Sequence, residues 1–164
     1  MSQQVVIDSL AFARDAGLIE GELPVADMPR AHDMLAEVGG SVRYRLQGRV
    51  SAKGEPQLLL QLDGFLPLRC QRCLERMDYP FHTESVLELV RGGRELSQDD
   101  LEDDTRDFLP VQKETDVLAL IEDQVILDLP VVPRHESCDL PQGEADDLEK
   151  SPFSVLAKLK RQAQ

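Results

Sequence analysis

The clearest pattern in the chain is the alternation of apolar and polar residues between positions 41 and 50. Apolar side chains recur at the even positions Val42, Tyr44 and Leu46, whereas the odd positions are polar and hold three arginines. A period of two residues is that of a β-strand, whose successive side chains point to opposite faces of a sheet. The pattern predicts a strand with one buried face and one arginine-rich face.

Three further apolar runs extend this strand into a meander. They cover residues 57–62, 65–70 and 79–90 and are separated by polar turn signals. Between the first two runs, Asp63-Gly64 has the composition of a tight hairpin turn. Pro67 lacks a backbone N–H, which predicts that the run containing it lies at a sheet edge or at a bulge.

The N-terminal part of the chain carries weaker signals. Residues 4–10 contain a short apolar run that predicts an edge strand, followed by a turn near Gly17 and Gly21. Residues 26–38 space their apolar side chains in a roughly helical pattern and end at Gly39-Gly40, which is typical of a helix stop. We therefore expect a strand, a turn and a helix before the meander.

A stronger helix signal lies in the second half of the chain. Thr115 or Asp116 can cap the helix, and Pro130 prevents its continuation. Its apolar side chains share one stripe that should pack on the sheet, made of Val117, Leu120, Ile121, Val125 and Leu129.

Two acidic stretches separate these elements from a tail. Residues 91–107 hold a Gly-Gly pair and a dense acidic run without apolar periodicity, which predicts a solvated, mobile loop. Residues 139–150 have the composition of an acidic linker, and residues 151–164 predict a short amphipathic helix. The predicted fold class is α+β, an antiparallel β meander or partly closed barrel with packed helices and an acidic loop, in one domain of residues 1–138.

Composition narrows the class of protein. Apolar residues make up 41% of the 164 residues, which suffices for one core, whereas aromatic residues make up 4% and argue against stacking platforms for single-stranded nucleic acid. No run approaches the roughly 18 apolar residues of a membrane span, and the first residues lack the layout of a secretory signal. Three cysteines then indicate reduced thiols or a metal site, and the chain is expected to be cytoplasmic.

The net charge of −13 is unevenly distributed. Residues 40–94 hold nine Lys and Arg against six Asp and Glu, so this stretch is +3 and the remainder is −16. RNA could approach only through the middle of the chain, whereas basic partners such as ribosomal proteins would be attracted to most of the surface.

Four residues could hold a metal ion. Cys70 and Cys73 form a CxxC at a predicted corner between strands, which is how zinc knuckles present two thiolates. His135 and Cys138 would complete a site for one structural zinc ion if the two pieces of chain meet. The alternative is that the cysteines are small buried hydrophobic residues and the histidine lies on the surface.

Two other uses of these residue types fit less well. His82 could substitute as a metal ligand, although an outward-facing histidine on a strand is the simpler interpretation. A redox-active CxxC needs a following helix that lowers the pKa of the first thiol, whereas here Pro80 and a strand follow.

Basic residues suggest a phosphate-contacting surface. On a strand face and around the CxxC they are Arg43, Arg45, Arg49, Arg69, Arg72 and Arg76, and on the tail they are Lys158, Lys160 and Arg161. The alternative is a solvated polar face that pairs with nearby carboxylates, and for the tail a helix that only docks Phe153 on the body. Both interpretations stay open.

Catalytic signatures are missing from the chain. It has no GxGxxG, P-loop, GxSxG or HExxH motif, so no pattern places a nucleophile beside a base. The acidic cluster at residues 99–104 lacks the central glycine and the terminal glutamate of a calcium loop. We therefore expect no enzymatic activity and no small-molecule substrate.

Three segments together resemble the YceD family, in the same order along the chain. They are the CxxC at residues 70–73, the helix and its exit LALIEDQVILDLPVVP at residues 118–133, and PFSVLAKLK at residues 152–160. The resemblance implies a non-catalytic accessory protein that supports synthesis, processing or stability of large-subunit (23S) ribosomal RNA in bacteria. Some relatives carry extra cysteines after the helix, where this chain has only His135 and Cys138.

Two functional hypotheses follow from these observations. In the first, the arginine-rich face contacts large-subunit ribosomal RNA or a ribosomal protein. In the second, the acidic stretches at 95–107 and 139–150 make the protein an escort for a basic ribosomal protein, without direct RNA contact. A third reading, a thiol enzyme using Cys70 or Cys73, requires a strongly depressed thiol pKa.

Overall fold

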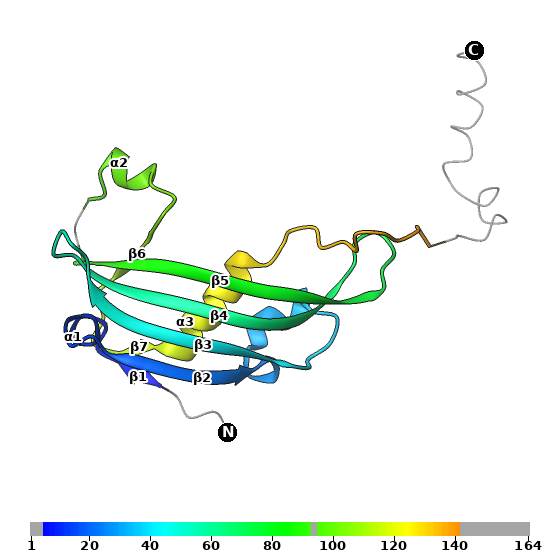
Figure 1. Cartoon of the computed structure of the whole chain (residues 1–164), viewed down its shortest axis with the longest axis horizontal. Helices are drawn as coiled ribbons and strands as arrows, with labels where there is room; N and C mark the ends of the chain where they lie inside the picture. The colour runs from blue at the N-terminus through cyan, green and yellow to red at the C-terminus, as the bar shows by residue number, and fades with distance from the viewer. Residues whose placement is uncertain (1–4, 93–94, 142–164) are drawn as a thin grey trace, which may run out of the picture.

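The computed structural model describes residues 5–92 and 95–141, and these form a curved sheet with the helix α3 (Val117–Asp128) across one face (Figure 1). The elements in chain order are β1 (Val6–Ile7), α1 (Ser9–Arg14), β2 (Leu18–Pro24), the 3-10 helices η1 (Val25–Asp27) and η2 (Pro29–Met34), β3 (Ser41–Val50), β4 (Pro56–Arg69), β5 (Arg76–Val90), α2 (Gln98–Leu101), β6 (Asp107–Pro110), β7 (Thr115–Asp116) and α3 (Val117–Asp128).

The main sheet has five strands in the order β2-β3-β4-β5-β6. The first four form an antiparallel meander, and β6 joins β5 in parallel. Among the described residues β2 and β6 are the two edges of the sheet and do not pair with each other, so the sheet is open. The α+β class and the meander are confirmed, whereas the structure supports no partly closed barrel.

A single strand, β4, replaces the two strands and hairpin predicted around Asp63-Gly64. Gly64 pairs with Val42 on one side and with Phe81 on the other, so it lies inside the sheet. A Cβ atom at Gly64 would lie 2.8 Å from the carbonyl oxygen of Ser41. The hairpin prediction is wrong because this glycine permits close approach of β3 rather than a turn.

Pro67 lies where β4 has a strand on one side only. The pairing of β4 with β3 ends at Gly64, and beyond it β4 pairs with β5 alone. The carbonyl oxygen of Pro67 accepts a hydrogen bond from the N–H of Ala36 at 2.6 Å. The backbone N and O atoms of one strand residue point to the same side of the strand. The nitrogen of Pro67 therefore points away from β5, as its carbonyl oxygen does, and its lack of an N–H costs no hydrogen bond between β4 and β5.

The region before the meander differs from its prediction. Gly21 lies within β2, where a Cβ atom would be 2.6 Å from the hydroxyl oxygen of Tyr44, so this glycine makes room for a ring instead of a turn. The predicted helix at 26–38 is replaced by the short 3-10 helices η1 and η2, which are separated by Met28 in a non-helical conformation. Pro29 begins η2, because a proline suits the first position of a helix and not its interior.

Helix α3 is confirmed, and it crosses one face of the sheet (Figure 1). The Asp116 side chain caps it by accepting from the N–H groups of Leu118 and Ala119. Arg30 fastens η2 to α3, because its guanidinium donates to the buried Glu122 at 2.7 Å and to the carbonyl oxygen of Ala119 at 3.1 Å. The core between these layers is aliphatic and includes Leu46, Leu58, Leu60, Leu62, Leu66, Val117, Ile121 and Val125.

The predicted acidic loop contains a turn of helix, α2, with a capping box. Ser97 accepts from the N–H of Asp100, and the Asp100 carboxylate accepts from the N–H of Ser97. Arg106 joins this segment to the sheet through ion pairs with Asp100 at 3.0 Å and with Glu88 of β5 at 2.5 Å. The described residues of this stretch therefore have a local structure that the acidic composition did not predict.

No helix within residues 5–92 and 95–141 combines the length and the apolar character needed to cross a membrane.

Replacement of Gly48 by alanine is expected to destabilise the protein by roughly 1–3 kcal/mol. A Cβ atom at Gly48 would lie 2.1 Å from the carbonyl oxygen of Phe12, at the contact between β3 and α1. The midpoint of urea unfolding measures the effect, and Gly92→Ala is the matched control because nothing lies within 4 Å of its Cβ position. Equal midpoints for the two variants would contradict the close contact.

Candidate metal centre

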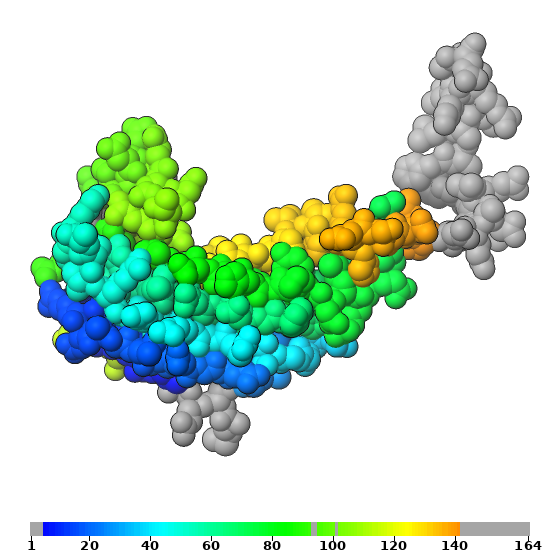
Figure 2. Space-filling view, viewed as in Figure 1, coloured from blue at the N-terminus to red at the C-terminus, as the bar shows by residue number. Residues whose placement is uncertain are grey.

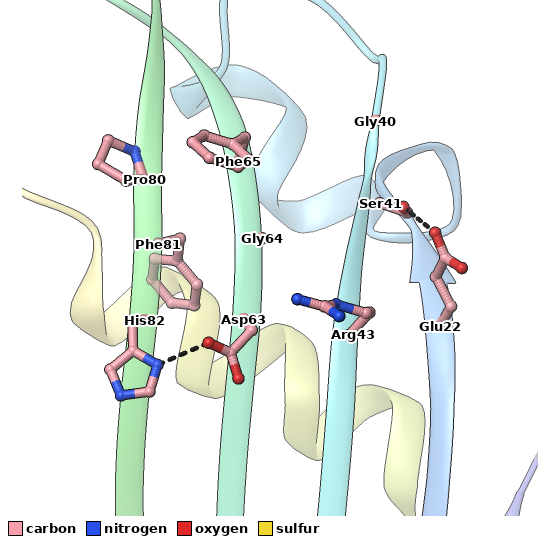
Figure 3. Close-up of a pocket in the computed structure, with 10 residues that line it drawn as sticks. All are labelled: Glu22, Gly40, Ser41, Arg43, Asp63, Gly64, Phe65, Pro80, Phe81 and His82. Carbon is pink, nitrogen blue, oxygen red and sulfur yellow. Dashed lines mark hydrogen bonds and ion pairs between the residues drawn. The ribbon is translucent and has the colours of Figure 1, made fainter.

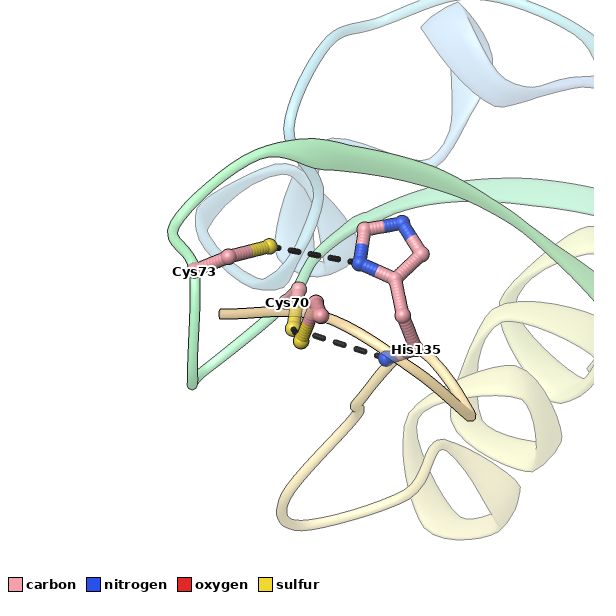
Figure 4. A group of neighbouring side chains, drawn as sticks. Cys70, Cys73 and His135 are labelled. Atoms are coloured by element: carbon pink, nitrogen blue, oxygen red, sulfur yellow. Dashed lines mark hydrogen bonds between the residues drawn. The ribbon is translucent and has the colours of Figure 1, made fainter. Parts of the chain in front are cut away.

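The corner between β4 and β5 is a tight loop that begins at Cys70. The N–H of Cys70 donates to the carbonyl oxygen of Glu75 at 2.9 Å, and the N–H of Leu74 donates to that of Cys70 at 3.0 Å. Leu74 has a φ of 65°, a left-handed conformation that closes the loop. Cys70 and Cys73 are thereby turned toward the same side of the corner (Figure 4).

The segment that follows α3 brings the other half of the cluster to this corner. A backbone hydrogen bond from Gln71 N–H to the carbonyl oxygen of Pro133, 2.9 Å long, joins the two pieces of chain. The N–H of His135 then points at the sulfur of Cys70 at 3.5 Å. The CxxC and the HxxC thus meet, which was the condition for a site made of all four residues (Figure 4).

The four donor atoms lie at distances that suit one tetrahedral ion. Sγ of Cys70 is 3.7 Å from Sγ of Cys138, and Sγ of Cys73 is 3.3 Å from Nδ1 of His135. All four donor atoms lie within 4.8 Å of one another. Zinc bond lengths of about 2.3 Å to sulfur and 2.0–2.1 Å to nitrogen imply ligand separations of about 3.8 and 3.6 Å in a tetrahedron. The group could therefore bind a metal ion, and three sulfurs with one imidazole suit zinc better than magnesium or calcium.

The electrostatics of the cluster favour one thiolate and oppose a second. Burial, the largest effect on Cys70, raises its pKa, but hydrogen bonds from the backbone N–H groups of Cys73, His135 and Arg72 together outweigh burial and lower the pKa to about 5. Burial and the neighbouring thiols of Cys70 and Cys73 raise the pKa of Cys138 to about 11. A divalent cation would relieve this conflict, because it stabilises adjacent thiolates.

The other candidate uses of these residue types do not meet at the cluster. His82 lies on β5 and hydrogen bonds through Nδ1 to Asp63 at 2.7 Å, so it belongs to a different surface. Residues after Cys73 enter β5 at Arg76, not a helix that would favour redox chemistry. The lowered pKa of Cys70 meets the requirement of a thiol enzyme, but Cys70 is fully buried, so its sulfur is not open to a substrate.

Comparison with known proteins gives the chain its family. The sequence model of the YceD family, described as "Large ribosomal RNA subunit accumulation protein YceD", matches residues 58–160. The chain belongs to the YceD family. A protein of Haemophilus influenzae called "Large ribosomal RNA subunit accumulation protein YceD" is 30% identical over 147 residues, which cover 79% of this chain and 82% of the relative. No solved structure matches the chain.

The part matched to the YceD family contains both halves of the candidate metal site. The match begins at residue 58 in β4, includes α3 and continues to residue 160, beyond the last described residue, 141. The corner, the helix and the tail that carried the resemblance thus lie within one family match.

The arginines predicted to contact RNA differ in their surroundings. Arg45 pairs with Glu20 at 3.0 Å, and Arg76 pairs with Glu37 and Asp78. Arg49 donates to the side chain of Gln57. Within residues 5–92 and 95–141, no ion pair involves Arg43, Arg69 or Arg72, and Lys158, Lys160 and Arg161 lie outside the described residues.

The sheet face that carries Arg43 has charges of alternating sign. The strand register places Glu22, Arg43, Asp63 and His82 side by side across four strands. This row borders a shallow hollow of about 500 Å³ (Figure 3). The face is therefore mixed in charge and not uniformly basic.

Phe65 is a surface residue in this hollow that the sequence analysis did not single out. Its side chain is 64% exposed and lies opposite Pro80 in the strand register. The sequence signal for its exposure was the two-residue alternation along β4, which places Phe65 on the same face as Asp63. The predicted turn at Asp63-Gly64 interrupted this alternation, so the signal was missed.

Proposed function

We propose that this protein is a non-catalytic ribosome-biogenesis factor that supports synthesis, processing or stability of large-subunit (23S) ribosomal RNA and acts in the cytoplasm. The observation that carries the proposal is the family match, which covers residues 58–160 and includes the metal cluster. The name of the Haemophilus influenzae relative describes accumulation of the same RNA.

Polar groups in the hollow beside Arg43 and Phe65 support a binding role. Ser41 is bound to Glu22, and His82 is bound to Asp63, so the hydroxyl that could act as a nucleophile does not contact the imidazole that could act as a base (Figure 3). Among the described residues, the hollow therefore offers recognition groups without a coupled nucleophile and base.

A structural zinc ion fits this role. Cys70 and Cys73 on the β4–β5 corner, with His135 and Cys138 on the segment after α3, would hold it. When bound, zinc supplies a cross-link between these two parts of the chain. The cross-link would fix the position of Arg72, which lies inside the CxxC loop and could meet RNA phosphates.

Alternation of charge on the sheet face favours a second candidate function. On this face Arg45 is paired with Glu20. Arg43 lies between the carboxylates of Glu22 and Asp63 on the neighbouring strands. Such a face attracts polyanions weakly, because its positive charges are balanced by nearby negative ones. With a net charge of −13, the chain could instead escort a basic ribosomal protein without touching RNA.

Gene deletion followed by complementation tests the main proposal. Loss of the gene should lower 23S relative to 16S ribosomal RNA and reduce free large subunits in sucrose gradients, and the wild-type chain should restore both. Unchanged RNA levels and ribosome profiles after deletion would remove the proposal.

Crosslinking separates RNA contact from escort. Ultraviolet crosslinks to RNA that decrease in Arg43→Gln and Arg72→Gln variants, but not in an Arg91→Gln control, would favour direct contact. A ribosomal protein that stays bound after RNase treatment, without RNA crosslinks, would favour the escort.

A further inference from the structure

Helix α3 carries apolar residues on nearly every side, yet only part of its surface is buried. Val117, Ile121 and Val125 face the core, whereas the side chain of Leu127 is 76% exposed. Just after the helix, Val131 is 94% exposed. A helix that is apolar all round normally has a cover on each side, so the outer side of α3 lacks one among the described residues.

Two hollows lie next to each other along α3 and share two of their lining residues. The first, about 490 Å³, is lined by Met34, Leu68, Leu129 and Val131 among others. The second, about 430 Å³, is lined by Leu87, Phe108, Leu109 and Leu120 among others. Ile126 and Leu127 line both, so we call the combined surface the α3 groove.

The rim of the α3 groove is mainly acidic. Asp33 lines the first hollow with Arg69, while Asp107 and Asp123 line the second, and Asp123 already pairs with Arg30. Asp128, at the end of α3, is exposed beside Leu127. An apolar floor with an acidic rim fits a segment that has apolar residues on one face and cations at its end.

The sequence holds one such segment outside the described residues. In residues 151–161, Phe153, Leu156 and Leu159 recur at every third position, and Lys158, Lys160 and Arg161 follow at the end. We propose that residues 151–161 bind in the α3 groove of the same chain, with the three apolar side chains on its floor and the three cations at its acidic rim.

The chain leaves the groove at Pro133, eight residues before the last described residue, 141. Pro133 lines the first hollow, and Cys138 belongs to the metal cluster at the same end of α3. Figure 2 shows the end of α3 and the following segment, yellow to orange, along one edge of the molecule. The nine residues from 142 to 150 connect this described part to the segment and span at most about 30 Å.

Tethering makes weak binding sufficient. A short linker gives the segment an effective concentration in the mM range, so an intrinsic Kd of about 0.1 mM keeps most molecules bound. The docked segment covers Leu127 and Val131, the most exposed apolar side chains at this end of the molecule.

A single tryptophan can report the docking, because the sequence contains none. In full-length Phe153→Trp protein, the emission should be blue-shifted and protected from acrylamide relative to a peptide of residues 149–164 with the same substitution. Adding Leu127→Asp should return both readings to those of the peptide. Leu18→Asp is the matched control, because Leu18 is half exposed on β2 at the opposite sheet edge.

Several outcomes would overturn the proposal. Peptide-like emission from the full-length reporter would exclude docking, and a blue shift that survives Leu127→Asp would place the segment elsewhere. A shift that grows with protein concentration would indicate binding between two copies. Circular dichroism and metal content must stay unchanged in Leu127→Asp, and a benzophenone side chain at position 127 should crosslink to residues 151–161 in otherwise unmodified protein. These measurements use purified protein, so their result is independent of the ribosomal RNA phenotype.

Discussion

Cys70→Ser protein should be purified without the zinc ion that we expect in the wild type, at about one per chain. The buried sulfur of Cys70 is one of the four metal ligands, and it also accepts hydrogen bonds from the N–H groups of Arg72 and His135. Its loss therefore removes one ligand and weakens the contact between the β4–β5 corner and the segment after α3. A site saturated at a thousand times its Kd contributes roughly 4 kcal/mol, which corresponds to a Tm decrease of roughly 8–16 °C in a domain of this size.

Metal analysis and thermal unfolding with and without a chelator check this expectation. The chelator should lower the Tm of the wild type by that amount and leave Cys70→Ser unchanged, which separates loss of metal from the packing cost of serine. His82→Ala is the matched control, because His82 bonds to Asp63 and lies outside the cluster. If wild-type protein contains no metal, or if the chelator does not change its Tm, the four residues lie close together without binding a metal ion.

The candidate metal site was predictable in part from the sequence. Cys70 and Cys73 identified one half by their spacing, and His135 and Cys138 identified the other. Whether the halves meet depends on where the chain goes after α3, and that path is fixed by a hydrogen bond between Gln71 and Pro133. Such a contact between distant backbone groups leaves no trace in local spacing, so the sequence could name the ligands without placing them together.

The fold shows the same division between local and distant causes. Residue alternation predicted β3 with its observed bounds, and apolar spacing with a capping aspartate predicted α3, because both patterns depend on residues close in the chain. Gly21 and Gly64 were misinterpreted as turns, because their role is set by Tyr44 and Ser41 on a neighbouring strand. The parallel strand β6 has only four residues and follows an acidic stretch, so its apolar signal is too short to detect.

The ion pair between Arg106 and Glu88 could not be predicted from a local sequence pattern either. Arg106 and Glu88 are 18 positions apart, and the acidic surroundings of Arg106 suggested only a solvated loop. In the folded protein the Glu88 side chain is 1% exposed, and Arg106 lies against it. A carboxylate that is buried on the sheet gives this arginine a structural role that composition alone did not reveal.

Arg106→Ala should therefore destabilise the protein by roughly 3–5 kcal/mol, the cost of removing one partner of a buried ion pair. Its guanidinium contacts Glu88 at 2.5 Å and both Asp100 and Asp103 at 3.0 Å, and it also lies 5.3 Å from the centre of the Phe108 ring. Removing it takes a paired cation from a buried carboxylate and frees α2 from the sheet. Chemical unfolding measures the first effect, and faster hydrogen exchange in residues 97–103 measures the second.

Two matched variants test whether burial of Glu88 causes the loss of stability in Arg106→Ala. Arg45→Ala breaks an exposed ion pair with Glu20 and should cost about 0–1 kcal/mol, because water screens that pair. Glu88→Gln added to Arg106→Ala should recover part of the lost stability, since it removes the charge that the arginine neutralised. If Arg106→Ala and Arg45→Ala cost the same, or if Glu88→Gln adds its own full penalty to that of Arg106→Ala, the ion pair does not anchor the acidic segment.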